Sequence, residues 1–171
     1  LEMAKVLNEY FMSVFTREDL SNIPIMEEKD EKEILLDIDI TEERVIKALR
    51  QMKPNKAAGV DGLGSTFVKE SLKGILEPLV SLLGSSMDNT EVPEDWKRAN
   101  VSAIHKKGDK KNPANYRPVS LTSNIGKMME KIIKEDIVKL LERNQEIRDS
   151  QHGFRSKRSC LTNLLIFMEE V

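Results

Sequence analysis

The sequence has little cysteine and histidine, and these shortages exclude several classes of site. The single cysteine, Cys160, allows no internal disulfide and no cysteine-rich zinc site. The two histidines, His105 and His152, lie too far apart in the sequence for a metal-ligand spacing. No apolar run approaches the roughly 20 residues that span a bilayer, and the first residues lack the basic and apolar regions of a signal peptide. We therefore expect an intracellular protein, cytoplasmic or nuclear, with no membrane partner and no metal site of its own.

Basic residues are scarce in the first part of the chain and abundant in the second. Residues 1–95 hold 11 lysines and arginines against 20 aspartates and glutamates, a net charge of −9. Residues 96–160 hold 16 against 7, a net charge of +9. Such a basic block is typical of proteins that contact a polyanion. Lysines scattered over a solvated helix surface would give the same asymmetry, so charge alone leaves both interpretations open.

Apolar residues recur at helical spacing in several segments, and these predict a mostly helical chain. Thr41 and Ser159 are suited to cap the helices that follow them, and Pro78 is expected to split its helix or to begin the second half of it. The acidic residues 16–40 are expected to form a connector. Helices are predicted for residues 3–15, 41–53, 67–83, 125–141 and 160–171.

Two short segments predict a β-hairpin. Residues 98–106 contain β-branched residues and alternate between apolar and polar, and residues 118–122 can return as the partner strand. Residues 108–115 between them are polar and contain Gly, Pro and Asn, as turns do. The predicted fold class is therefore mostly α with a β-hairpin (α+β).

Cations gather around the predicted hairpin turn. Arg117 opens the return strand, and four lysines lie at or beside the turn: Lys106, Lys107, Lys110 and Lys111. Lysine supplies a point charge and arginine can bond two oxygens at once, so the tip is suited to hold phosphate. Lysines also keep exposed strand edges soluble, and this second interpretation stays open at this point.

Smaller features carry structural predictions. Gly59, Asp61 and Gly62 indicate a tight turn, in which the Asp61 side chain is expected to bond a nearby backbone N–H. Trp96 is expected to anchor the core rather than to stack on a base.

Four stretches together resemble the reverse transcriptases of jockey-like, LINE-type (non-LTR) retrotransposons. They stand in that family's order and are LNEYFMSVFT at 7–16, KAAGVDGL at 56–63, WKRANVSAIHKKGDKKNPANYRPVSLTSNIGKMMEKII at 96–133, and QHGFRSKRSC at 151–160. The resemblance implies a helical connector at residues 1–40, upstream of the polymerase domain. It also implies that residues 41–171 are an incomplete reverse transcriptase domain, namely the fingers of a right-hand polymerase fold without palm and thumb.

The family resemblance also implies partners and site residues. Lys106 or Lys107, together with Arg117, would hold the triphosphate of an incoming deoxynucleoside triphosphate. The RNA template would lie against residues of the stretch QHGFRSKRSC: Gln151, Gly153, Phe154, Arg155 and Arg158. Gly153 is expected to allow a close approach or a positive φ, and Phe154 either stacks or fills the core. The implied partners are RNA template, primer DNA, deoxynucleoside triphosphate and the missing palm and thumb.

The catalytic aspartates of the family lie in the palm, beyond Val171. The resemblance thus assigns no catalytic residue and no cofactor to this chain, although Mg²⁺ is expected for the full-length enzyme, and we predict that the chain alone does not polymerise. Gly64 and Ala103 stand where the family usually has proline, which loosens the local backbone. The alternatives are a catalytically dead RNA-binding relic, or a helical interaction protein without a nucleic-acid role.

Overall fold

The computed structural model describes residues 2–16, 18, 21, 37–153 and 155–170. They divide into two compact units, the first from Leu1–Glu28 and Asp39–Ile132, the second from Lys29–Ile38 and Ile133–Val171. The described part of the chain is mostly helical with one two-stranded antiparallel sheet, as the sequence predicts. In that part, no helix has both the length and the apolar character needed to cross a membrane.

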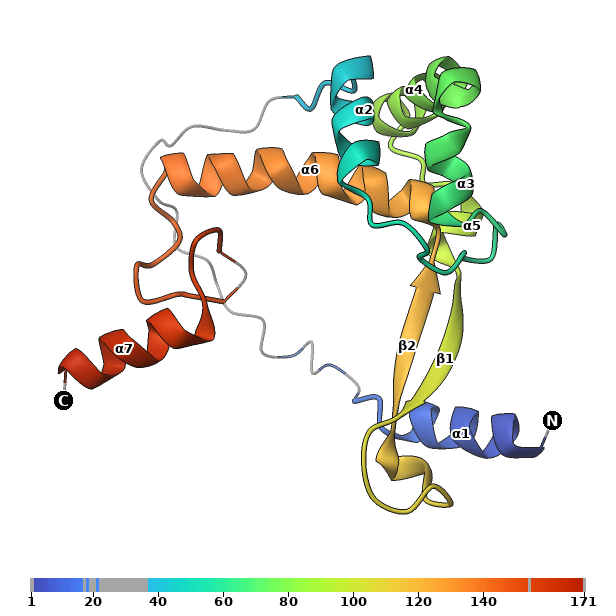
Figure 1. The fold of residues 1–171 in the computed structure, drawn as a ribbon, viewed down its shortest axis with the longest axis vertical. Helices are drawn as coiled ribbons and strands as arrows, with labels where there is room; N and C mark the ends of the chain where they lie inside the picture. The colour runs from blue at the N-terminus through green and yellow to red at the C-terminus, as the bar shows by residue number, and fades with distance from the viewer. Residues whose placement is uncertain (1, 17, 19–20, 22–36, 154, 171) are drawn as a thin grey trace. The chain divides into compact units, whose positions relative to one another are not determined.

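Each predicted helical segment contains a helix, but the segment 67–83 is divided between two helices and the short helix at 94–97 was not predicted (Figure 1). They are α1 (Glu2–Ser13), α2 (Glu42–Gln51), α3 (Ser65–Glu70), α4 (Leu72–Asp88), α5 (Glu94–Lys97), α6 (Asn124–Arg143) and α7 (Cys160–Glu170). The helix α6 belongs to the first unit up to Ile132 and to the second unit from Ile133. Most of the predicted connector at 16–40 lies outside the described residues.

The predicted cap of α2 is confirmed. The Thr41 hydroxyl accepts a hydrogen bond from the Arg44 N–H at 3.3 Å, which satisfies one of the free donors at the helix start. One face of the helix is buried through Val45, Ala48 and Leu49. This spacing of three and four residues is the apolar stripe seen in the sequence.

The prediction for Pro78 is wrong. The chain breaks between α3 and α4 at Ser71, and Pro78 lies inside α4, beyond its first turn. A proline in a helix interior costs about 3 kcal/mol, because it removes a hydrogen bond and its ring crowds the preceding turn. Leu79 and Leu83, one and five residues after Pro78, are buried. Burial of each side chain stabilises the fold by roughly 1.5–3 kcal/mol. Burial therefore keeps the helix continuous through the proline.

The core of the first unit lies among α2, α3, α4 and the start of α6 (Figure 1). Arg44 on α2 ties the first of these helices to the last, since its Nη2 donates to the Ile132 carbonyl at 3.1 Å. Trp96 on α5 packs against Gly126 of α6, where an added Cβ would lie 3.2 Å from the indole Cγ. The buried apolar side chains of this core are Val45, Ala48, Leu49, Val68, Leu79, Leu83, Met128, Met129 and Ile132.

The glycine-rich loop at 56–64 makes the predicted tight turn. Gly62 has a φ of +69°, and the Asp61 Oδ1 accepts from the Leu63 N–H at 3.0 Å. Gly59 lies directly against the backbone between β2 and α6, because an added Cβ would be 2.5 Å from the Ser123 nitrogen. The loop is thus packed onto the end of the hairpin.

Asn124, the first residue of α6, holds the same loop from the other side. Its side chain is 2% exposed, and its Nδ2 donates to the Leu63 carbonyl at 2.7 Å and the Ala57 carbonyl at 3.3 Å. A buried amide that satisfies two backbone carbonyls fixes the loop against the start of the helix. Nearby, the Asn100 Nδ2 of the hairpin donates to the Gly59 carbonyl at 3.4 Å.

The hairpin consists of β1 (Ala99–His105) and β2 (Tyr116–Thr122), paired antiparallel from Ala99↔Thr122 to His105↔Tyr116. The turn contains a short 3₁₀ helix, η2 (Pro113–Asn115), which α1 contacts. Both predicted strands and the polar turn are therefore confirmed.

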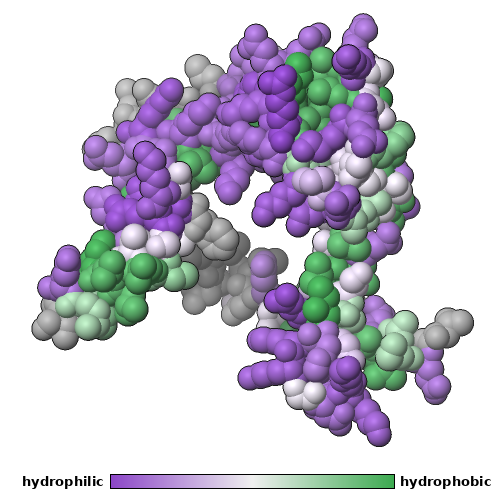
Figure 2. Space-filling view, viewed as in Figure 1, coloured by the Kyte–Doolittle hydropathy of each residue, from purple (hydrophilic) through white to green (hydrophobic). Residues whose placement is uncertain are grey.

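In the second unit, α7 begins with the predicted cap. Ser159 Oγ accepts from the Thr162 N–H at 3.2 Å, and Thr162 Oγ1 accepts from the Ser159 N–H at 2.9 Å. This reciprocal pair satisfies donors at the helix start. The apolar side chains of α7 are exposed, and Figure 2 shows them as a hydrophobic surface.

Candidate nucleic-acid interface

The end of the hairpin is held by its own side chains. Gly108 adopts a φ of +80°, and its carbonyl oxygen lies 3.1 Å from the His105 Nε2. The His105 ring meets the Tyr116 ring edge to face, with centroids 5.2 Å apart. The Tyr116 hydroxyl donates to the Lys110 carbonyl at 3.0 Å. His105 therefore has a structural role at the tip of the hairpin.

Polar side chains also shape the turn itself. Asn115 Nδ2 donates to the Asp109 carbonyl at 2.8 Å, while the Asp109 Oδ1 accepts from the Lys111 N–H at 2.9 Å. Asn112 Oδ1 accepts from the Ala114 N–H at 2.9 Å. Such local bonds define the backbone of a loop that has no core of its own. They leave the side chains of the lysines outside the network.

The cations of the hairpin are all exposed: Lys106, Lys107, Lys110, Lys111 and Arg117. Within the described residues, none of them has an ion-pair partner. Figure 2 shows the hydrophilic side chains that gather around this end of the hairpin. Among the described residues, no carboxylate would have to be displaced by a phosphate that binds these charges.

The strand register separates Lys106 from Lys107. Arg117 pairs with Ile104, and neighbouring residues along a strand point to opposite faces of the sheet. The Lys106 N–H donates to the Asn115 carbonyl at 2.7 Å, so the ladder continues to this residue. Lys106, two residues after Ile104, therefore shares the face of Arg117, and their Cβ atoms are expected roughly 7–8 Å apart as diagonal neighbours. Lys107 lies in the bend that follows, outside the strand pairing.

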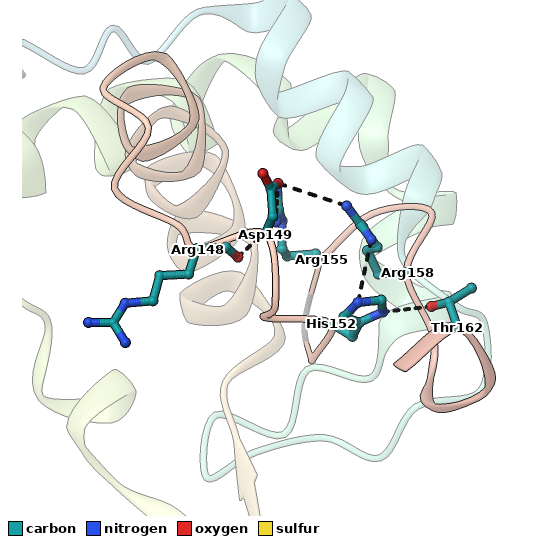
Figure 3. Close-up of polar contacts among 6 residues, drawn as sticks. All are labelled: Arg148, Asp149, His152, Arg155, Arg158 and Thr162. Atoms are coloured by element: carbon teal, nitrogen blue, oxygen red, sulfur yellow. Dashed lines mark hydrogen bonds and ion pairs between the residues drawn. The ribbon is translucent and has the colours of Figure 1, made fainter. Parts of the chain in front are cut away.

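In the second unit, the predicted residues Arg155 and Arg158 come together (Figure 3). Their guanidinium groups lie 3.8 and 3.9 Å from the same oxygen, Oδ1 of Asp149. Both arginine side chains are mostly covered, with 20% and 30% of their surface exposed, whereas Asp149 is 95% exposed.

The other predicted residues of this loop have mixed outcomes. Gln151 is exposed, and its backbone N–H donates to the Arg148 carbonyl at 3.0 Å. Gly153 has no positive φ, so that part of the expectation is wrong. An added Cβ would have none of the described atoms within 4 Å, and the expected close approach of a template stays a prediction. Phe154 lies outside the described residues.

His152 was missed as a site residue by the sequence reasoning. It is the second residue of the stretch QHGFRSKRSC, is only 5% exposed, and contacts both Thr162 and Arg158 (Figure 3). Ser-x-x-Thr at 159–162 was the one sequence signal nearby, since it marks the start of a helix. Nothing in the sequence indicated that the histidine would pack beneath an arginine.

Carboxylates of the described residues do not gather into a metal site. No group of three or more His, Cys, Asp or Glu side chains among them could hold a metal ion. The Asp61 Oδ2 is buried and has no hydrogen-bond partner among the described residues, but Asp61 belongs to no such group there.

Sequence relatives of the chain include RNA-directed DNA polymerases of mobile elements, while no family model matches it. It is 31% identical over 119 residues to the RNA-directed DNA polymerase from mobile element jockey of Drosophila melanogaster, covering 68% of this chain and 13% of that protein. It is 26% identical over 120 residues to the probable RNA-directed DNA polymerase from transposon BS of the same species, covering 70% and 13%. A Pol polyprotein from retrotransposable element R2 of Popillia japonica is 29% identical over 128 residues, covering 74% and 16%.

The aligned part is thus a small share of each relative, 13–16% of its length in these three cases. The relatives do not favour the alternative of a helical interaction protein without a nucleic-acid role. The chain therefore belongs to the family of RNA-directed DNA polymerases from non-LTR, jockey-like retrotransposons, and it is homologous to one segment of these proteins.

Proposed function

We propose that this chain forms the fingers of a reverse transcriptase, with residues 1–40 as a connector and 41–171 as an incomplete polymerase domain. In this proposal it binds the incoming deoxynucleoside triphosphate and the RNA template. It works with primer DNA and with a palm and thumb supplied by the rest of the polymerase, in the cytoplasm or the nucleus. The polymerase names of the relatives and the exposed basic hairpin support the proposal.

The observation that carries the proposal is the shared face of Lys106 and Arg117. Phosphoryl transfer depends mainly on positioning and on neutralising the charge of the phosphate oxygens. Lys106 can approach one phosphate as a point charge, while Arg117 can bond two oxygens of a neighbouring phosphate. Because Ile104 lies opposite Arg117 on the same face, the sugar and base would meet a partly apolar surface beside the charges.

The loop at 151–158 is proposed to contact the template. Arg155 and Arg158 supply charge, and Gln151 of the same loop is exposed. Phosphate contacts by such residues hold a strand in place without reading its sequence. This role agrees with a polymerase, which must accept any template sequence.

The proposed contribution stops short of catalysis. Mg²⁺ in the full-length enzyme would neutralise the triphosphate and activate the primer hydroxyl, and its carboxylate ligands are expected outside this chain. The purified chain should therefore incorporate no labelled nucleotide on a primed RNA template. Incorporation would contradict the division between binding in this chain and chemistry elsewhere.

Nucleotide binding by four single variants tests the proposal. Lys106→Gln and Arg117→Gln should each weaken binding of a fluorescent deoxynucleoside triphosphate about tenfold, the scale of one lost hydrogen bond to a charged group. The matched controls are Lys107→Gln, in the bend after β1, and Lys134→Gln, on α6, which remove the same charge. Equal losses for all four variants would show that bulk charge, and not the Lys106–Arg117 face, binds the nucleotide.

A further inference from the structure

Two arginines of the second unit converge on a single exposed oxygen. Arg155 Nη1 lies 3.8 Å and Arg158 Nη2 lies 3.9 Å from the Asp149 Oδ1 (Figure 3). Both distances are longer than a hydrogen bond, so the carboxylate faces the guanidinium groups without being bonded to them. At 95% exposure, Asp149 is held mainly by weak, screened attraction.

Each arginine also has a second polar contact, and the two contacts are with different residues. Arg155 Nη1 donates to the Arg148 carbonyl at 3.1 Å. Arg158 Nη1 lies 3.4 Å from the His152 Nε2, while its Nη2 faces Asp149. The two terminal nitrogens of Arg158 thus have separate roles, one as an anchor and one directed at an anion. The Arg148 side chain itself extends away from the cluster (Figure 3).

The contact with Arg158 assigns the proton of His152. Arginine can only donate, so a hydrogen bond from Arg158 Nη1, 3.4 Å away, requires the lone pair of His152 Nε2. The proton of a neutral His152 is then on Nδ1, 2.8 Å from the Thr162 Oγ1. Thr162 Oγ1 can accept there, since it also lies 2.9 Å from the Ser159 carbonyl, to which it can donate. Buried at 5% exposure, this ring is a fixed support for the guanidinium.

We propose that Arg155 and Arg158 form a phosphate-binding fork for the backbone of a nucleic acid, that Asp149 occupies the fork when no nucleic acid is bound, and that His152 positions Arg158. The fork rests on the proposed function, because it specifies how the template loop holds its ligand. Asp149 stands in for one phosphate oxygen. Because His152 already holds Arg158 in place, this side chain loses less conformational entropy when the phosphate binds.

A phosphate would displace Asp149 because it matches the fork better. It offers several strong acceptor oxygens, which can bond both guanidinium groups at hydrogen-bond distance. A cavity of about 530 Å³ adjoins the fork and gives the ligand a place to lie. Its lining residues are Glu142, Gln145, Ile147, Arg148, Asp149 and Arg155. When Asp149 swings out, its full exposure means that it loses no buried contact.

Removing the Asp149 charge is the first test. With a short fluorescein-labelled single-stranded RNA, Asp149→Asn should bind about three- to tenfold tighter than wild type, because a close competing charge is gone. Glu130→Gln, an exposed residue of α6 in the same basic block, removes an equal charge but pairs with neither arginine, and should change affinity less than about twofold. In an Arg155→Gln/Arg158→Gln background, the gain from Asp149→Asn should disappear. That background should also lower the salt slope of RNA binding by about one to two phosphate contacts.

His152 is tested separately from the charges. His152→Gln can still present an oxygen to Arg158 and should bind RNA like wild type, whereas His152→Phe removes the acceptor and should bind about threefold weaker or worse. In an Arg158→Gln background, His152→Phe should cause no further loss. A loss that persists there would show that the histidine merely supports the fold, and the positioning role would be overturned.

The outcomes separate failure of the fork from failure of the proposed function. If Asp149→Asn binds RNA no tighter than Glu130→Gln, or loses both affinity and thermal stability, Asp149 does not occupy a phosphate site and the fork is wrong. If Asp149→Asn changes binding of a deoxynucleoside triphosphate but not of RNA, the assignment to a nucleic-acid backbone is wrong. A titration with pyrophosphate, followed by NMR of the arginine Nε–H groups, supplies the last arm. Signals of Arg155 and Arg158 that shift without any RNA binding by wild type would keep the fork and reject the nucleic-acid function, while no shift and no binding would reject both.

Discussion

Substituting Gly59 by alanine should strongly destabilise the first unit. The added Cβ would lie 2.5 Å from the Ser123 nitrogen, 2.6 Å from the Thr122 carbonyl carbon and 2.9 Å from the Ser123 Cα. These are backbone atoms at the junction of β2 and α6, so no side chain can rotate away to make room. Overpacking of this kind typically lowers the free energy of unfolding by roughly 1–3 kcal/mol. Because the added methyl group would meet backbone atoms, we expect a loss of about 3 kcal/mol. For a domain of this size the thermal midpoint would fall by roughly 10 °C or more.

Two further glycines provide matched controls for the same chemical change. Gly84 lies inside α4 with no atom within 4 Å of an added Cβ, so Gly84→Ala should stabilise by about 0.5–1 kcal/mol. Gly126→Ala would meet the Trp96 side chain at 3.2 Å, and a side chain can shift, so its effect should lie between the other two.

Urea and thermal unfolding, followed by far-ultraviolet circular dichroism and by fluorescence of the single tryptophan, would measure this series. The expected order of stability is Gly84→Ala, wild type, Gly126→Ala, Gly59→Ala. If Gly59→Ala were as stable as wild type while Gly84→Ala gained stability, the loop at 56–64 would not pack on the hairpin base as described.

Three other predictions concern single sites. Asn124→Asp would direct a carboxylate at two backbone carbonyls and should destabilise by about 3 kcal/mol or more, measured by urea unfolding; unchanged stability would disprove the contact. Gly64 has a φ of −68°, which proline also adopts, so Gly64→Pro should stabilise by about 0.4–1 kcal/mol, and a lower thermal midpoint would contradict this. A hydrogen bond from Lys97, together with the charge of Lys97, lowers the pKa of Glu94. The pair therefore stabilises the folded chain above the ordinary pKa of glutamate, and this stabilisation is lost as the pH falls through the lowered pKa. Lys97→Met should return that pKa towards its ordinary range in an NMR titration, and an unchanged pKa would refute the pairing.

The sequence predicted the features that depend on local chemistry. Thr41 and Ser159 cap their helices because hydroxyl oxygens satisfy free N–H groups, which is a property of a few adjacent residues. The hairpin followed from alternation and from a polar turn. Asp61 bonds the Leu63 N–H, as aspartate does in turns.

The sequence did not predict features that depend on tertiary packing. Pro78 remains inside α4 because the burial of Leu79 and Leu83 outweighs a local preference. His152 packs beneath Arg158 through contacts that span a loop, which no periodicity encodes. The placement of Lys106 on the face of Arg117 also depends on the register, since a shift of one residue would exchange the two faces of the hairpin.

Labelling with a reactive nucleotide tests the proposed role of the hairpin most directly. In an acyl-phosphate derivative of a deoxynucleoside triphosphate, a lysine amine beside the terminal phosphate attacks the acyl carbon, forms an amide and releases the triphosphate. Mass spectrometry then identifies the modified lysine. The shared face with Arg117 predicts labelling at Lys106, suppressed by excess unlabelled nucleotide and reduced in Arg117→Gln. Equal labelling of Lys106, Lys107, Lys110 and Lys111, insensitive to competitor, would contradict a nucleotide site on this face.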